Sequence, residues 1–244
     1  MDYPYTEPCG CPHYIGADGQ PTCEPCATLV EQLAPECGVE VGLKLDVDNN
    51  LDGAGITPEN FRGIDVAVEF SMPAAVVGNI ERIAALGVNL VVGTTGWYEQ
   101  LDRVRAAVER AGTGLVYGPN FSVGVQAFLR VVEVAARLIK DQTAYDAWAY
   151  EIHHKMKKDA PSGTLLKLKQ VMEQAGYRRP IDTASNRAGA VPGIHEIGFD
   201  SEADTITLTH TARSRVGFAR GALQAAQWVA GRKGVYEFGE TLFS

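Results

Sequence analysis

The run from Glu151 to Thr164 holds the densest set of chemically useful side chains in the chain. Two adjacent imidazoles, at His153 and His154, can move protons near pH 7. The end of the run, Pro161 to Thr164, precedes apolar residues at helical spacing and is therefore expected at a helix start. Free backbone N–H groups at that start, two hydroxyls and a nearby lysine cluster could together bind a carboxylate or a phosphate.

A simpler interpretation applies to each part of this run taken alone. Ser162 and Thr164 could merely cap a helix, and the lysines could belong to a solvated loop. A histidine at a strand end often makes only a structural hydrogen bond, and this is what we expect of His195 further along the chain. The catalytic interpretation depends on the whole fourteen-residue string rather than on any member of it.

The elements before this run alternate between helix and strand. Short apolar strands that alternate with helices indicate a parallel sheet covered on both faces. Ligands of such sheets bind beyond the carboxyl ends of the strands. The expected strands are Val39–Asp46, Ile64–Phe70, Asn89–Val92 and Gly114–Tyr117, and the expected helices are 28–34, 73–86 and 98–111.

The pattern changes after Phe121. We expect an apolar helix to about Ile139, a strand over 146–152, the helix that follows the run from Glu151 to Thr164, and two further strands near 193–199 and 205–212. These elements predict an α+β unit whose mixed sheet has one face free to pack on a partner subunit. The predicted division is an atypical segment 1–28, a dinucleotide-binding domain 29–120 completed by 216–244, and a substrate and oligomerisation domain 121–215.

The run E-x-H-H-x-x-K-x-D-A-P-S-G-T resembles the signature of the dihydrodipicolinate reductase family. Four further motifs resemble that family in the same order, and the resemblance extends from about Leu29 to the C-terminus. These motifs are Glu69–Pro73, Gly93–Trp97, Asn120–Val125 and Arg213–Ala219.

The resemblance implies an α/β fold, with a Rossmann-like parallel-sheet domain and an α+β domain that binds substrate and assembles four subunits. It implies reduction of 4-hydroxy-tetrahydrodipicolinate to tetrahydrodipicolinate in the diaminopimelate and lysine pathway, with NADH or NADPH as cofactor. His153 takes the place of the proton donor and Lys157 the second catalytic place. The substrate-binding places fall on His154, Ser162, Gly163, Thr164 and Arg215, although Arg215 could equally form a salt bridge at a domain boundary.

The cofactor-binding places fall at the expected strand ends. They are Asp46, Gly93, Thr94, Thr95, Asn120 and Phe121. Asp46, at the end of the second expected strand, could accept both ribose hydroxyls of NAD and repel a 2′-phosphate, while Lys44 softens that preference. An ordinary turn aspartate is the alternative for Asp46.

One part of the family pattern is missing. Family members open with a strand that runs into a G-x-x-G-x-M-G turn, which holds the cofactor pyrophosphate. Here residues 1–14 contain several prolines and no apolar run, which disfavours a central strand, and Gly16–Gly19 is expected to be a turn. An alternative function is therefore a non-catalytic oligomeric homologue with impaired cofactor binding.

Four of the five cysteines lie in the first 26 residues beside His13. They are Cys9, Cys11, Cys23 and Cys26. Their spacing could form a zinc knuckle, which would favour a metal-dependent regulatory protein as a third hypothesis. A disulfide-stapled segment, free thiols in a leader, or residues from a shifted reading frame are the alternatives, and we assign no metal ligands.

Composition limits the remaining classes. A formal net charge of −8 and an isoelectric point near 5.2 disfavour nucleic acid as a partner. No stretch is apolar and long enough to predict a membrane span, and the first residues lack the pattern of a signal peptide. We therefore expect a cytoplasmic enzyme of a small dicarboxylate, with no membrane partner.

Overall fold

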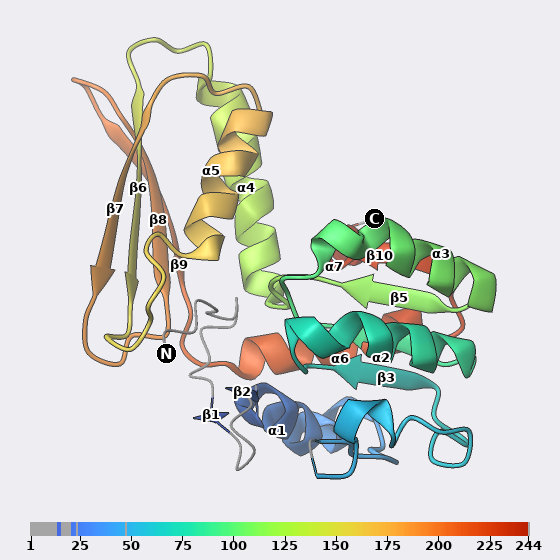
Figure 1. Cartoon of the computed structure of the whole chain (residues 1–244). Helices are drawn as coiled ribbons and strands as arrows, with labels where there is room; N and C mark the ends of the chain where they lie inside the picture. The colour runs from blue at the N-terminus through green and yellow to red at the C-terminus, as the bar shows by residue number, and fades with distance from the viewer. Residues whose placement is uncertain (1–13, 16–20, 23, 47, 244) are drawn as a thin grey trace. The chain divides into compact units, whose positions relative to one another are not determined.

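The computed structural model describes residues 14–15, 21–22, 24–46 and 48–243 (Figure 1). They divide into two compact units. The first unit comprises the described residues up to Ser122 together with 216–243, and the second comprises Val123–Arg215. The N-terminal motifs before Tyr14, including Cys9, Cys11 and His13, lie outside the described residues, as does Cys23.

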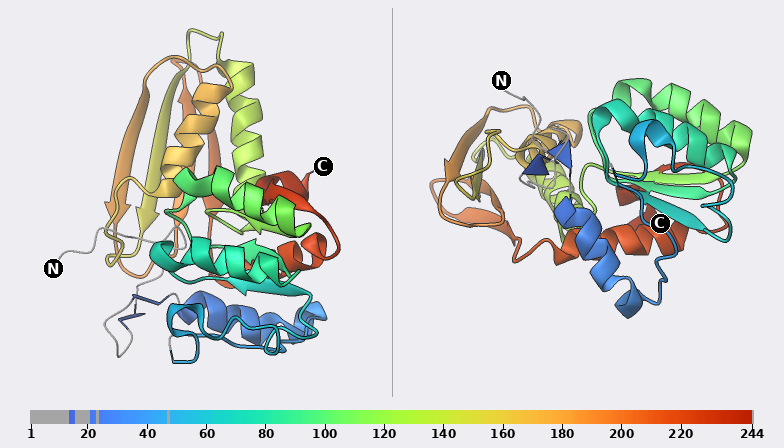
Figure 2. Two further views of the ribbon diagram at one scale, coloured as in Figure 1. Left: turned by 45° about the vertical axis from the view of Figure 1, so that its right-hand side comes forward. Right: turned by 60° about the horizontal axis from the view of Figure 1, so that its bottom comes forward.

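The first unit is built on a four-stranded parallel sheet in the order β10-β5-β4-β3. Helices α2 and α3 pack on one face, and α1 and α6 cover the other (Figure 2). The strands are β3 (Val66–Glu69), β4 (Asn89–Val92), β5 (Gly114–Tyr117) and β10 (Gly234–Glu237). The helices are α1 (Glu24–Leu33), α2 (Pro73–Ala85), α3 (Leu101–Ala111), α6 (Val216–Val229) and α7 (Phe238–Leu242), with short 3-10 turns at Pro35–Cys37, Leu51–Gly53 and Tyr98–Gln100. Two further strands of two residues each, β1 (Tyr14–Ile15) and β2 (Pro21–Thr22), pair antiparallel.

Local sequence explains these elements. All four residues of β4 are buried, as expected for a central strand covered on both faces. Pro73 occupies the first turn of α2, where its missing N–H costs no hydrogen bond. Gly112, with φ of 69°, ends α3 in the left-handed conformation that glycine adopts without strain.

The predicted strand Val39–Asp46 is wrong, because these residues form no strand. Leu43 and Leu45 pack against the core cluster that includes the buried side chains of α2, so the segment is held by side chains rather than by a strand ladder. Within the described residues, β3 has no neighbour on its outer edge. Residues 39–46 do not pair with this free edge, so the segment lacks the backbone ladder that defines a strand.

The second unit contains the mixed sheet β7-β6-β8-β9. Strand β6 (Asp146–His153) runs parallel to β7 (Ile181–Arg187) and antiparallel to β8 (Ile194–Asp200), which pairs with β9 (Thr205–Thr211). Helices α4 (Val123–Ile139) and α5 (Gly163–Gln174) cover one face of this sheet (Figure 1). The predicted fold class, a parallel sheet plus an α+β unit with a mixed sheet, is confirmed.

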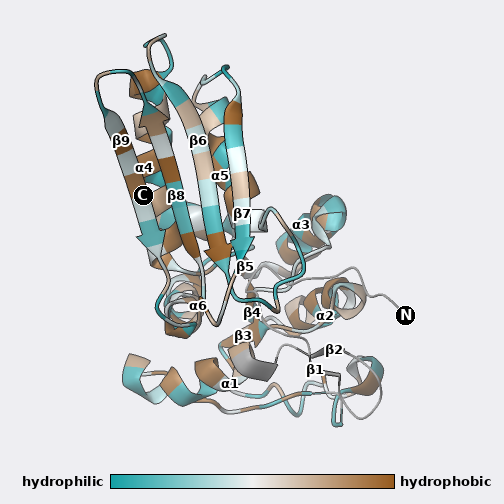
Figure 3. Ribbon diagram, turned by 90° about the vertical axis from the view of Figure 1, so that its left-hand side faces the viewer, coloured by the Kyte–Doolittle hydropathy of each residue, from teal (hydrophilic) through white to brown (hydrophobic). Residues whose placement is uncertain are grey.

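Strand β7 was not predicted from the sequence. Its residues, Ile181–Arg187, are mostly polar and largely exposed, so they show no hydrophobic alternation. The face of the sheet that is turned away from α4 and α5 mixes polar and apolar residues (Figure 3). No helix among the described residues is long and apolar enough to cross a membrane.

Candidate functional site

The start of α5 presents an anion-binding main chain. Ser162 is the N-cap residue, and its Oγ accepts a hydrogen bond from the Leu165 amide at 3.2 Å. The next two amides, of Gly163 and Thr164, make no hydrogen bond within the part of the chain that the structure describes. Two unpaired N–H groups at the positive end of a helix form a site for a carboxylate or phosphate oxygen.

A fully buried carboxylate, Glu151, lies behind this helix start. Its Oε1 accepts the Ser162 amide at 2.9 Å and the Nη2 of Arg187 at 2.9 Å, and the Ser162 hydroxyl donates to Oε2. Burial by itself raises the pKa of Glu151, but contacts with His195, Ser162 and Arg187 outweigh it and hold that pKa well below its usual value. Glu151 is therefore ionised at neutral pH, and its hydrogen bonds hold the amide and the hydroxyl of Ser162 in place.

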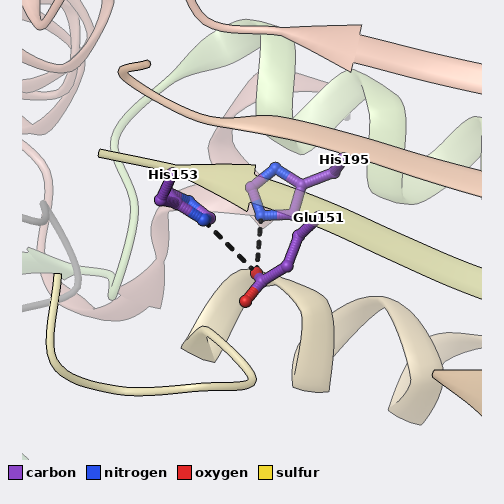
Figure 4. Close-up of side chains that lie close together, drawn as sticks. All are labelled: Glu151, His153 and His195. Carbon is purple, nitrogen blue, oxygen red and sulfur yellow. Dashed lines mark ion pairs between the residues drawn. The ribbon is translucent and has the colours of Figure 1, made fainter. Parts of the chain in front are cut away.

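Two imidazoles face the same carboxylate (Figure 4). The Nδ1 of His153 and the Nε2 of His195 each lie 3.5 Å from Glu151 Oε2, and their ring centroids are 5.0 Å apart. His195 Nε2 also lies 3.2 Å from Ser162 Oγ, within hydrogen-bond distance. Burial, reinforced by the neighbouring His195, lowers the pKa of His153 to about 4, so its ring is neutral at pH 7 in the unliganded protein.

Lys157 lies in the loop between β6 and α5, with only 4% of its side chain exposed. Its Nζ is 2.8 Å from Asp159 Oδ1, and its amide donates to the His154 carbonyl at 3.1 Å. His154 is half-buried directly after β6, and Arg215 is half-buried at the end of the second unit. The second unit therefore contains all seven residues that the sequence assigns to catalysis and substrate binding.

In the first unit, the loop after β4 is anchored to a buried carboxylate at the end of β3. Thr94 Oγ1 donates to Glu69 Oε2 at 2.7 Å, and the side-chain Nδ2 of Asn79 donates to Glu69 Oε1 at 3.3 Å. Burial raises the pKa of Glu69. The Trp97 indole donates to the Thr94 carbonyl at 2.7 Å, so the side chain and carbonyl of Thr94 hold the loop together. Thr95, the next residue of this loop, is half-buried.

Packing explains two other residues of the predicted cofactor site. A Cβ at Gly93 would lie 2.0 Å from the ring of Phe70, so this glycine is required by the neighbouring strand end whether or not a cofactor approaches it. The ring of Phe121 is buried 4.7 Å from that of Phe238. Asn120 Oδ1 accepts the Ser122 amide at 2.9 Å and shapes the chain beyond β5.

Asp46 does not end a strand, which removes the premise of its assignment to the ribose. It is exposed, and its Oδ1 accepts the Asp48 amide at 2.9 Å, as in an ordinary aspartate turn. Lys44 Nζ is 2.8 Å from Glu31 Oε2. A ribose contact by Asp46 stays a prediction.

Comparison with known proteins supports the grouping of these residues. The family described as "Dihydrodipicolinate reductase, N-terminus" matches residues 22–121, and "Dihydrodipicolinate reductase, C-terminus" matches residues 124–242. The chain belongs to the dihydrodipicolinate reductase family.

Individual members of the family agree with this assignment. A 4-hydroxy-tetrahydrodipicolinate reductase of Thiobacillus denitrificans is 38% identical over 201 residues, which is 74% of each chain. The protein of that name from Neisseria gonorrhoeae is 32% identical over 232 residues, covering 87% of this chain and 83% of the relative. A dipicolinate-bound dihydrodipicolinate reductase from Paenisporosarcina sp. TG-14 shares the fold, with a TM-score of 0.69 at 21% identity over 88% of this chain and 95% of that one.

A metal ion is poorly suited to the buried cluster of this reductase. Glu151, His153 and His195 offer one ligand atom each, and these atoms lie within 4.8 Å of one another. However, both carboxylate oxygens already accept hydrogen bonds, and the Arg187 guanidinium bonds to one of them. A cation would have to displace the Ser162 hydroxyl and tolerate the neighbouring positive charge, so the cluster suits hydrogen bonding better than metal coordination.

Sequence reasoning missed three members of the site. Glu151 stood in the signature run without a role, Asp159 was unassigned, and Arg187 lay in a strand that was not predicted. For Glu151, the signal was its spacing of two residues from His153, which puts both side chains on one face of β6. No local signal points to Arg187, because only the pairing of β7 with β6 brings it to the site.

Proposed function

We propose that this chain catalyses the NADH- or NADPH-dependent reduction of 4-hydroxy-tetrahydrodipicolinate to tetrahydrodipicolinate in the diaminopimelate and lysine pathway. Membership of the reductase family over nearly the whole described chain supports the reaction. The observation that carries the substrate class is the start of α5, where two unpaired amides lie in a unit that also contains a buried lysine and a neutral imidazole. The direct test is substrate-dependent oxidation of NADH or NADPH by the purified chain.

The residues of the second unit divide the work as follows. The amides of Gly163 and Thr164, with the Thr164 hydroxyl, bind one carboxylate of the substrate. Lys157 stabilises negative charge that develops during reduction, and His153 delivers the proton. His154 and Arg215 are the remaining candidates for carboxylate binding.

The negative charge of the substrate would change the protonation state of His153. A neutral imidazole with a pKa of about 4 is a poor proton donor at pH 7. Two substrate carboxylates close to the ring would favour the imidazolium form and raise the pKa of His153. We infer that substrate binding itself charges the proton donor.

A nicotinamide nucleotide is the cofactor that this function requires, and when bound it supplies the hydride. The loop after β4, with half-buried Thr95 and exposed Gly96 at the carboxyl end of the sheet, would hold the nicotinamide side of such a ligand. The comparison of KM for NADH and NADPH tests which of the two nucleotides the chain uses.

Binding of the cofactor pyrophosphate has weaker support in this chain. Helix α1 begins at Glu24, and Pro25 in its first turn has no N–H to donate. The family match begins at residue 22, so it does not extend over a strand and glycine-rich turn before α1. This observation favours the second candidate function, an assembly-competent homologue with impaired cofactor binding.

Binding of pyridine-2,6-dicarboxylate tests the anion site without turnover. We expect Thr164→Val to weaken this binding about tenfold or more, because a hydrogen bond from a hydroxyl to a charged carboxylate is lost. Thr143→Val, at an exposed turn of the same unit, should bind the dicarboxylate like the parent chain. Calorimetry measures both affinities, and equal binding by Thr164→Val and the parent would place the anion site elsewhere.

We also propose a homotetramer that assembles through the outer face of the mixed sheet, and a cytoplasmic location. The half-buried side chains of Trp148, Tyr150 and Ile152 alternate with the core-facing residues of β6 and lie on this outer face. Such a sheet face suits packing against a second copy. Light scattering of the purified chain should give four times the mass of one chain, and a monomer at all concentrations would contradict the proposal.

A further inference from the structure

Arg187 lies at the end of β7, directly beside His153 on β6 in the parallel register. Its side chain is only 17% exposed. One nitrogen, Nη2, donates both to Glu151 Oε1 at 2.9 Å and to the carbonyl oxygen of Asp159. A single guanidinium thus contacts β6 and the loop that leaves it.

The two partners of Arg187 lead to different parts of the substrate site. Glu151 holds the amide and the hydroxyl of Ser162, so it sets where α5 starts. Asp159 pairs with Lys157 through its side chain at 2.8 Å while its main chain is held by Arg187. The anion-binding amides and the proposed catalytic lysine are therefore connected through one side chain.

Two further main-chain hydrogen bonds join the end of β6 and the first part of the loop to the residues just after β7. The Ala188 amide donates to the His153 carbonyl at 2.8 Å, and the Lys155 amide donates to the Gly189 carbonyl at 3.1 Å. Beyond Lys157, the bonds that tie the loop end to the sheet involve Arg187, Glu151 and, through the Ser162 hydroxyl, His195. Arg187 and Glu151 take part in most of these bonds.

We propose that Arg187 is a positioning residue of the reductase site, which sets the α5 start through Glu151 and the Lys157 loop through Asp159. This inference rests on the proposed function, and it adds a residue that acts through Glu151 and Asp159. A buried ion pair often contributes little net stability, because desolvation offsets its attraction. The main consequence of this pair is therefore geometric.

The experiment compares Arg187→Gln with Arg179→Gln. Arg179 lies in the same unit and also donates to main-chain oxygens, those of Ile139, Lys140, Gln142 and Tyr145. Both variants lose an arginine that binds backbone carbonyls, and thermal unfolding measures the stability lost by each. Arg187→Gln should lower kcat/KM and pyridine-2,6-dicarboxylate affinity about 10- to 100-fold, since small displacements of binding groups have effects of this size. Arg179→Gln should change neither by more than about twofold, because surface and structural changes remote from the site leave its geometry intact.

The acid side of the pH profile gives a second signature. In Arg187→Gln, Glu151 keeps Ser162, His195 and His153 as neighbours, with Lys157 and Asp159 in the loop, but loses its guanidinium partner. Its pKa should rise, so the fall of kcat/KM with decreasing pH should begin at a higher pH than in the parent chain. If the role of Arg187 were purely structural, the acid side of the pH dependence of kcat/KM would not shift.

Amide exchange separates this inference from the proposed function. With no ligand present, the amides of residues 155–165 should exchange faster in Arg187→Gln than in the parent chain. In Arg179→Gln they should exchange at the parent rate. Inactivity of the parent chain would refute the proposed function and leave this readout intact. Equal exchange, affinity and pH profiles in Arg187→Gln and the parent would overturn the inference. If Arg187→Gln does not fold, Arg187→Lys, which keeps a charge opposite Glu151, replaces it with the same expected directions and smaller changes.

Discussion

Lys157→Ala is expected to lower turnover by about 10²- to 10⁴-fold, the usual contribution of a positioned proton donor or charge stabiliser. The Lys157 side chain is almost fully buried, and its Nζ pairs with the Asp159 carboxylate, whose side chain is 30% exposed. Because that carboxylate is already partly solvated, loss of its partner should lower stability only modestly. The measurement is steady-state reduction at saturating cofactor, together with thermal unfolding.

Lys155→Ala is the matched control for this prediction. Lys155 is exposed two residues earlier in the same loop, and it is its main-chain amide that donates a hydrogen bond, to the Gly189 carbonyl. Its replacement should leave turnover within about twofold of the parent, as for most surface changes. Lys157→Met, which removes the charge but keeps an apolar stem, guards against loss of packing in the alanine variant. Turnover at the parent rate in both Lys157 variants would refute the catalytic assignment.

The second large effect concerns the cofactor. We expect the chain to bind NADH and NADPH about 10²-fold more weakly than a version in which residues 1–28 are replaced by a strand and a G-x-x-G-x-M-G turn. Each charge-assisted hydrogen bond that the turn adds to the pyrophosphate contributes about 1.5 to 3 kcal/mol. The added strand would also pair with the outer edge of β3, which has no neighbour among the described residues. Titration by tryptophan fluorescence measures both affinities.

Pyridine-2,6-dicarboxylate provides the control for the cofactor experiment. Its proposed site lies wholly in the second unit, so both versions should bind it equally in the absence of cofactor. Equal cofactor affinity in the two versions would show that the first 28 residues supply the pyrophosphate contacts in another way. Weak cofactor binding together with negligible turnover in the original chain would favour the impaired homologue over the reductase.

Much of the site could be predicted because its residues are close in sequence. The alternation of β6 puts Glu151 and His153 on one face, and the Pro-Ser-Gly-Thr run starts α5 with Ser162 as its cap. Local periodicity and capping chemistry suffice for such features, since they depend on neighbours within a few residues. The same reasoning located β3, β4 and β5 and the helices between them, and the resemblance to the reductase family followed from motifs within these elements.

The tertiary structure decided what depends on distant partners. Residues 39–46 have the composition of a strand, but an extended segment becomes a strand only when a neighbour pairs with its backbone. Arg187 and His195 reach the site because β7 and β8 flank β6 in register, and nothing in their local sequence states that pairing. The apolar pattern predicts which face of an element is buried, while the set of charges that meet there is determined only when the strands assemble.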